Sequence, residues 1–130
     1  MDFRDGVWQA KQGSDISFTV DMSESIEIDN FSMNFYLYQD AWIFGPSSLK
    51  FLVSDDGEYF SEASIVKNDD VFEKDERQTV INFNSGVLNG VSGRYVKVVV
   101  ENAGPCPDWH AAATEPTWLF VDEIVINEAD

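Results

Sequence analysis

The sequence predicts an all-β protein, a β-sandwich or jelly roll of roughly eight antiparallel strands. Three observations lead to this fold class. Apolar and polar residues alternate in several short runs, as in strands with one buried face. Glycine, proline, asparagine and aspartate residues that favour turns separate these runs. No segment carries an apolar stripe sustained at the helical period.

The alternating runs occupy most of the first two-thirds of the chain. Residues 16–20 are predicted to form a half-buried strand, and residues 2–13 before them are predicted to be irregular. The longest alternation runs through residues 26–37, and shorter ones cover residues 49–53 and 79–83. Turns are expected at 54–57 and 85–93, and a charge-dense, solvated connection is expected at 68–76.

The last third of the chain combines two strands with an irregular segment. Residues 94–101 place valines on one face at period two, and residues 118–126 are apolar on both faces, which predicts a central strand covered on both sides. The intervening loop holds two prolines, Trp109 and the only histidine, His110. A rigid aromatic loop held by core strands is a usual place for function.

Length and charge narrow the possible functions. The 130 residues are expected to form one domain, spanning 1–130, with a substantial core. Eight basic and 24 acidic residues give a net charge of −16, so nucleic acid and anionic membranes are poor partners. No apolar run is long enough for a membrane span, and the start lacks a signal peptide; it is expected to be cut from a longer protein.

Several motifs together resemble the discoidin, or coagulation factor 5/8 type C, family. They are Phe-Arg-Asp-Gly-Val-Trp-Gln (3–9), Ile-Ser-Phe-Thr-Val-Asp (16–21), Trp-Ile-Phe-Gly-Pro-Ser-Ser-Leu-Lys-Phe (42–51), Val-Ser-Asp-Asp-Gly (53–57), Arg-Tyr-Val-Lys-Val (94–98) and Trp-Leu-Phe-Val-Asp-Glu-Ile (118–124). The Cys-Pro-Asp-Trp-His loop at 106–110 is similar to that of a narrower group. This group comprises the C-terminal accessory domains of bacterial family 20 β-N-acetylhexosaminidases, or chitobiases.

The resemblance implies a galactose-binding-like jelly roll that is not itself catalytic. It implies a carbohydrate-binding role beside a catalytic domain, and an extracellular, periplasmic or cell-surface location. The ligand expected is a terminal galactose- or N-acetylhexosamine-type sugar. The main alternative is a structural domain that packs on the catalytic domain without binding sugar. Binding of lipid or of cell-surface proteins is disfavoured by the net charge and by the lack of a basic loop cluster.

Sugar recognition needs an aromatic platform and planar hydrogen-bonding groups, and the loops offer both. Trp109 with His110 is the sharper candidate, because the pair joins an aromatic ring to a side chain that donates and accepts. Trp42 with Asp40 is the second candidate. Alternatively, both loops close one end of the core. Trp118 is expected mainly in the core, although a ligand role stays open, and Trp8 is expected to pack internally.

A structural calcium ion is a further implication of the resemblance. A glutamate at the position of Glu123 lies near the calcium site in the family, and Asp5, Asp2 and loop carbonyls would supply further oxygen ligands. The alternative is that Glu123 pairs with Arg4 or caps backbone amides. The acidic turn that precedes this site in the family is shortened or missing here.

Catalytic interpretations find little support in the sequence. Pro107 between Cys106 and His110 prevents a helical turn from aligning a thiol with an imidazole. A zinc site needs more ligands than one cysteine and one histidine. Neither a marked carboxylate pair for glycoside hydrolysis nor a glycine-rich phosphate loop is present. The chain is therefore predicted not to be an enzyme by itself.

Overall fold

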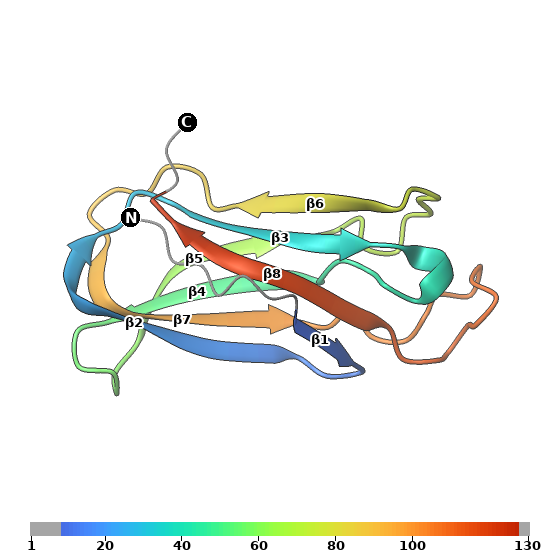
Figure 1. Ribbon diagram of the computed structural model, residues 1–130, viewed down its shortest axis with the longest axis horizontal. Helices are drawn as coiled ribbons and strands as arrows, with labels where there is room; N and C mark the ends of the chain where they lie inside the picture. Colours follow the sequence, from blue (N-terminus) through green and yellow to red (C-terminus); the bar gives the residue numbers. More distant parts are fainter. Residues whose placement is uncertain (1–8, 128–130) are drawn as a thin grey trace.

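Two four-stranded sheets face each other in the computed structural model, which describes residues 9–127 and, within them, all side chains except those of Gln9, Ala10 and Glu123 (Figure 1). Every strand pair is antiparallel. The first sheet has the order β1 (Gln9–Gln12), β8 (Trp118–Ile126), β3 (Phe31–Leu37), β6 (Thr79–Asn84). The second has the order β2 (Ile16–Glu27), β7 (Ser92–Glu101), β4 (Ser48–Ser54), β5 (Ser61–Lys67). This confirms the predicted all-β sandwich.

The core fills the space between the sheets with the side chains that alternation predicted. The rings of Phe31 on β3 and Phe51 on β4 stack across the two sheets, with centroids 4.6 Å apart and planes 4° from parallel. Both side chains are fully buried, as are Val96, Val98 and Val100 on the central strand β7. No helix in the described part of the chain is long and apolar enough to span a bilayer.

A β-bulge in β8 explains why that strand is apolar on both faces. Phe35 pairs with Val121, but Met33 pairs with Ile124, so β8 contains one more residue than β3 over this step. The extra residue reverses the alternation, and Leu119 and Ile126 therefore both face the core. Trp118 and Phe120, before the bulge, are only half-buried. The prediction of a strand covered on both sides is wrong for this part of β8.

The long alternation at 26–37 is divided between the two sheets. Strand β2 ends at Glu27 and β3 begins at Phe31, with buried Ile28 at the crossing point. The sequence analysis did not predict two of the strands, β5 and β1. The edge strand β5 does not alternate cleanly because a register shift opposite Phe51 and Leu52 interrupts it. The short strand β1 lies inside the segment predicted to be irregular, and its pairing with β8 defines it.

Candidate functional site

Three connections between strands meet at one end of the sandwich (Figure 1). They are residues 38–47 between β3 and β4, which contain the 3₁₀ helix η1 (Gln39–Ala41), residues 68–78 between β5 and β6, and residues 102–117 between β7 and β8. Hydrogen bonds join the first connection to both of the others. The loops that carry Trp42 and Trp109 thus form one continuous end surface.

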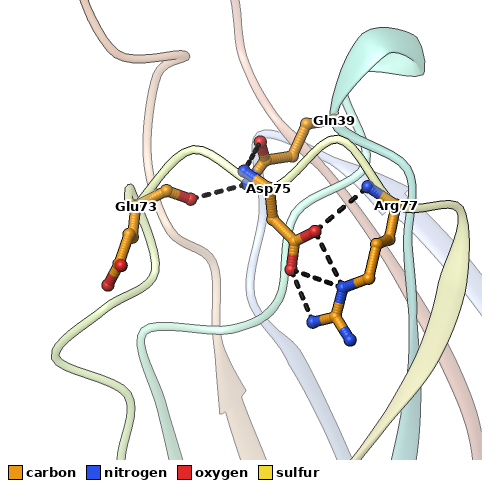
Figure 2. Close-up of polar contacts among 4 residues, drawn as sticks. All are labelled: Gln39, Glu73, Asp75 and Arg77. Atoms are coloured by element: carbon orange, nitrogen blue, oxygen red, sulfur yellow. Dashed lines mark hydrogen bonds and ion pairs between the residues drawn. The ribbon is translucent and has the colours of Figure 1, made fainter.

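Gln39 holds the three connections together. Its side chain is 4% exposed, its Nε2 donates to the carbonyl oxygen of Glu73 at 3.0 Å, and its Oε1 accepts from the amide of Asp75 at 2.8 Å (Figure 2). Its own carbonyl oxygen accepts hydrogen bonds from His110 Nε2 at 2.6 Å and from the Trp42 amide at 2.9 Å. The sequence analysis did not single out Gln39, because the residues that its side chain binds are 34 and 36 positions away.

An ion pair fixes the middle connection just beyond Gln39. Arg77 Nη2 lies 2.6 Å from Asp75 Oδ2, and Arg77 Nε donates to Asp75 Oδ1 at 2.9 Å (Figure 2). The Arg77 amide also donates to the same carboxylate at 3.0 Å. These side-chain and main-chain bonds lower the pKa of Asp75 from 3.8 to about 2. Both charged groups lie near the surface, so the pair orders the loop more than it stabilises the whole fold.

Trp109 is the most exposed aromatic residue in the 102–117 connection. Its side chain is 42% exposed. The indole Nε1 donates to the carbonyl oxygen of Phe72 at 2.9 Å, and the ring lies against buried Phe44, with centroids 6.1 Å apart. One part of the indole is therefore held by the protein while the rest contacts solvent. This arrangement gives a fixed, partly exposed aromatic surface.

His110 has a supporting position beside Trp109. Because the carbonyl oxygen of Gln39 can only accept, Nε2 of His110 carries the proton in that bond. Nδ1 accepts from the amide of Ala112 at 2.9 Å. The imidazole also packs on Phe44 and on Trp109, at centroid distances of 5.9 and 5.8 Å. With both nitrogens engaged inside the protein, His110 orients Trp109 and has no ring nitrogen left for a ligand in this conformation.

Trp42 and Asp40 lie in and just after η1. Trp42 adopts a left-handed backbone conformation, with φ of 67°, which is uncommon for a bulky side chain. Its carbonyl oxygen accepts from the Trp118 amide at 2.8 Å, and its own amide is bonded to Gln39, so the main chain here is tied on both sides. The Trp42 ring is half-buried, and the Asp40 side chain is exposed.

A cavity of about 280 Å³ lies under the 68–78 connection. This volume is just below the range for ligand pockets, about 300–1,000 Å³. Its apolar lining includes Leu37, Ile81 and Phe83 from β3 and β6. Gln39, together with charged residues of the connection, lines it as well: Asp70, Glu73, Lys74, Asp75. The cavity and Trp109 are therefore parts of the same loop assembly, joined through Phe72 and Gln39.

Cys106 does not form a reactive pair with His110. The cysteine is buried, and desolvation raises the pKa of its thiol. The amide and carbonyl of Cys106 pair with Glu115 and Thr114 across the loop, at 2.7 and 3.0 Å. The imidazole is committed to Gln39 and Ala112. This segment is thus a hydrogen-bonded hairpin that presents Trp109, with no activated nucleophile.

The remaining predicted positions lie elsewhere. Trp118 is on the outer face of the first sheet, half-buried, rather than in the core between the sheets. Trp8 and Asp5 lie outside the described residues, and Glu123 is in the β8 bulge with its side chain outside the description. Within 9–127, no described group of three histidine, cysteine, aspartate or glutamate side chains is placed to hold a metal ion. The calcium site at Glu123 and Asp5 stays a prediction.

The solved structures that match this arrangement of strands include carbohydrate-binding modules. The module CpGH89CBM32-6 of Clostridium perfringens superposes with a TM-score of 0.61 and 17% identity over 97% of this chain and 82% of its own. The family 32 module of AlyQ, in complex with 4,5-unsaturated mannuronic acid, superposes with a TM-score of 0.59 and 13% identity over 97% of this chain and 83% of its own. A putative chitobiase fragment from Bacteroides thetaiotaomicron has a TM-score of 0.56 and 15% identity over 96% of this chain and 72% of its own.

The chain has the β-sandwich fold of the family 32 carbohydrate-binding modules. The resemblance to discoidin-like domains is thereby confirmed at the level of the fold. No protein-family model matches the sequence, and no curated protein matches it significantly. At 13–17% identity, the shared property with these family 32 modules is the arrangement of strands.

Proposed function

We propose that this chain is a non-catalytic carbohydrate-binding module of a bacterial glycoside hydrolase, in which it serves a chitobiase-type catalytic domain. Its ligand is a terminal galactose- or N-acetylhexosamine-type sugar. The binding surface is the end of the sandwich that carries Trp109, with Trp42 and Asp40 on the neighbouring connection. His110 and Gln39 orient these loops and do not contact the sugar.

The observation that carries this proposal is the fixed, partly exposed indole of Trp109. A pyranose presents an apolar C–H face that packs on an aromatic ring, and a ring that is already held loses little entropy on binding. Phe44, His110 and the Phe72 carbonyl hold this indole in place. The exposed carboxylate of Asp40 is an acceptor for sugar hydroxyls at the same end.

The charge around the site favours a neutral sugar. Acidic side chains border it: Asp70 and Glu73 of the 68–78 connection lie beside the cavity, and Asp108 precedes Trp109 in the 102–117 connection. With a net charge of −16, the chain repels a uronic acid such as the ligand of the AlyQ module. Neutral hexoses and N-acetylhexosamines carry no such penalty.

A weak site of this kind works by tethering. Binding of a chain end by the module keeps a linked catalytic domain near further substrate, which raises the effective substrate concentration without a new contact in the active site. The module and its enzyme then act outside the cytoplasm, where polymeric glycans are found.

A second candidate function rests on the exposed aromatics at the same end. Phe72 and Trp109 are 37% and 42% exposed and are linked by a hydrogen bond. Aromatic residues of this kind anchor protein interfaces, so the same surface would suit packing against the catalytic domain without sugar. The two functions differ in whether the isolated chain binds a glycan.

A glycan array followed by calorimetric titration tests the proposal, with Trp109→Ala as the variant. We expect saturable binding of a neutral terminal hexose or hexosamine and a loss of about ten-fold or more in affinity in the variant. Tyr59→Ala is the matched control, because Tyr59 is also an exposed aromatic, at 81%, in the β4–β5 turn at the opposite end. Unchanged binding by Trp109→Ala would contradict the site, and an array with no hit would favour the packing role.

A further inference from the structure

The outer face of the first sheet carries a row of aromatic rings. Four half-buried aromatic side chains lie next to one another there: Tyr36 near the end of β3, Tyr38 just after it, and Trp118 and Phe120 on β8. Their centroid distances are 6.5 Å for Tyr36–Tyr38, 6.4 Å for Tyr36–Phe120 and 5.9 Å for Trp118–Phe120. These four residues are called the aromatic strip below. They lie opposite the core side chains of the same strands, such as Leu119.

Uncharged polar groups border the aromatic strip. Gln78 donates to the Tyr36 hydroxyl, and Asn82 on β6 donates to Asn34 Oδ1 at 2.9 Å. Val80, opposite Tyr36 in the register, is 51% exposed. Planar amides beside aromatic rings are the groups that bind sugar hydroxyls and sugar C–H faces.

This face differs from the outer face of the second sheet. There, alternation turns Lys50, Glu62 and Lys97 outward, and Asp21 pairs with Arg94 at 2.8 Å. On the outer face of the first sheet, alternation leaves one charged side chain, Asp122, among the described strand residues. Although the chain has 32 charged residues, the side chains described on this sheet face thus include a single charge.

The aromatic strip is continuous with the loop end of the sandwich. The Trp118 amide donates to the Trp42 carbonyl oxygen at 2.8 Å, and Tyr38 pairs with Ile43 at 3.0 Å. Trp118 and Tyr38 therefore begin the strip where the candidate site ends. From there the strip follows β8 and β3 away from the loops.

We propose that the aromatic strip extends the loop site and binds the inner units of a neutral glycan chain. This inference rests on the proposed function, which assigns the chain end to the loops around Trp109. Successive pyranose faces pack on Trp118, Phe120 and Tyr36, and the side chains of Asn34 and Gln78 bind their hydroxyls. With Asp122 as the one charge among the side chains described on this face, the surface fits an uncharged polymer better than an acidic or basic partner.

Ligand length separates this inference from the proposed function. Calorimetric titration of the intact chain would use two series, β-1,4-linked N-acetylglucosamine and β-1,4-linked galactose, each as dimer and hexamer. In the series that binds, the hexamer is expected to bind about ten-fold or more tightly than the dimer, and because both have a single non-reducing end, such a gain comes from contacts with the inner units.

Substitutions on the sheet then assign the gain to the aromatic strip. Phe120→Thr and Trp118→Thr remove the rings but place a β-branched residue, which suits a strand, at each position; they should reduce hexamer affinity to that of the dimer while leaving dimer affinity unchanged. Val99→Thr, on the outer face of the central strand β7, is the matched control and should change neither. Val80→Thr, at an exposed edge position opposite Tyr36 and outside the core, provides a second test.

The outcomes distinguish the two proposals. Equal affinity for dimer and hexamer, or a hexamer gain that survives both Phe120→Thr and Val80→Thr in folded protein, would overturn the strip while the loop site stands. Dimer binding that survives Trp109→Ala together with a hexamer gain lost in Phe120→Thr would refute the loop site and keep the strip. No binding in either series at either length would refute both.

Discussion

Replacing Gln39 with alanine tests whether one buried amide organises the loop end. The change removes the donor to the Glu73 carbonyl and the acceptor of the Asp75 amide, at 3.0 and 2.8 Å, and leaves the backbone of η1 in place. The 68–78 connection then loses its two bonds to η1. The hydrogen bond between Phe72 and Trp109 depends on this connection, so the aromatic surface is expected to loosen as well.

The expected loss of stability follows from the burial of this side chain. Two hydrogen bonds contribute about 1 kcal/mol each, and the partners left without a bond are only partly buried, so water replaces some of the loss. Removal of a 4% exposed side chain adds a cavity cost of about 1 kcal/mol. The total is about 2–4 kcal/mol, or a decrease of roughly 6–15 °C in the midpoint of thermal unfolding.

Urea unfolding and hydrogen exchange together measure this effect. Gln12→Ala is the control, because Gln12 also donates to a backbone carbonyl, that of Pro116 at 3.1 Å, but on the surface, where the loss should be about 0.5 kcal/mol. The Asp75 amide should exchange faster in Gln39→Ala than in Gln12→Ala. Equal stability of the two variants, with an unchanged rate at Asp75, would refute the role assigned to Gln39.

Two further predictions concern the ion pair and the core. Arg77→Ala should raise the pKa of Asp75 from about 2 toward 3.8 in an NMR titration, and a pKa that stays near 2 would contradict the assignment. Because the pKa of Asp75 is lower in the folded state than in the unfolded state, the ion pair stabilises the loop above about pH 4, and this stabilisation is lost as the pH falls toward 2. Phe51→Ala should lower the free energy of unfolding by about 3–5 kcal/mol, through the lost stack on Phe31 and the cavity, whereas half-buried Leu52→Ala should cost clearly less.

Local patterns predicted the strands whose burial alternates. The runs at 16–20, 49–53, 79–83 and 94–101 all lie in strands, because one face of each meets the core. Strand β5 gave no such signal, since an edge strand with a bulge has little buried surface to encode. Aromatic residues in loops marked Trp42 and Trp109 as candidates, and the structure places their connections side by side.

The roles within the site were harder to predict. His110 was predicted as a ligand residue from its place beside Trp109; its Nδ1 accepts from Ala112, two residues away, but its Nε2 donates to the carbonyl oxygen of Gln39, 71 residues away, and local sequence does not indicate that partner. Gln39 and Phe72 have no motif around them that signals a site. Their importance follows from contacts with segments more than 30 residues away.

The sequence by itself determined the all-β class, most strand positions, the acidic surface and the aromatic loops, because each of these is recorded in neighbouring residues. The tertiary structure decided what depends on distant segments. It divided the alternation at 26–37 between two sheets, and it reversed the faces of β8 at a bulge, which turned Trp118 and Phe120 outward. A pattern of period two shows which residues share a face, but only pairing with another strand fixes where that face changes and what lies against it.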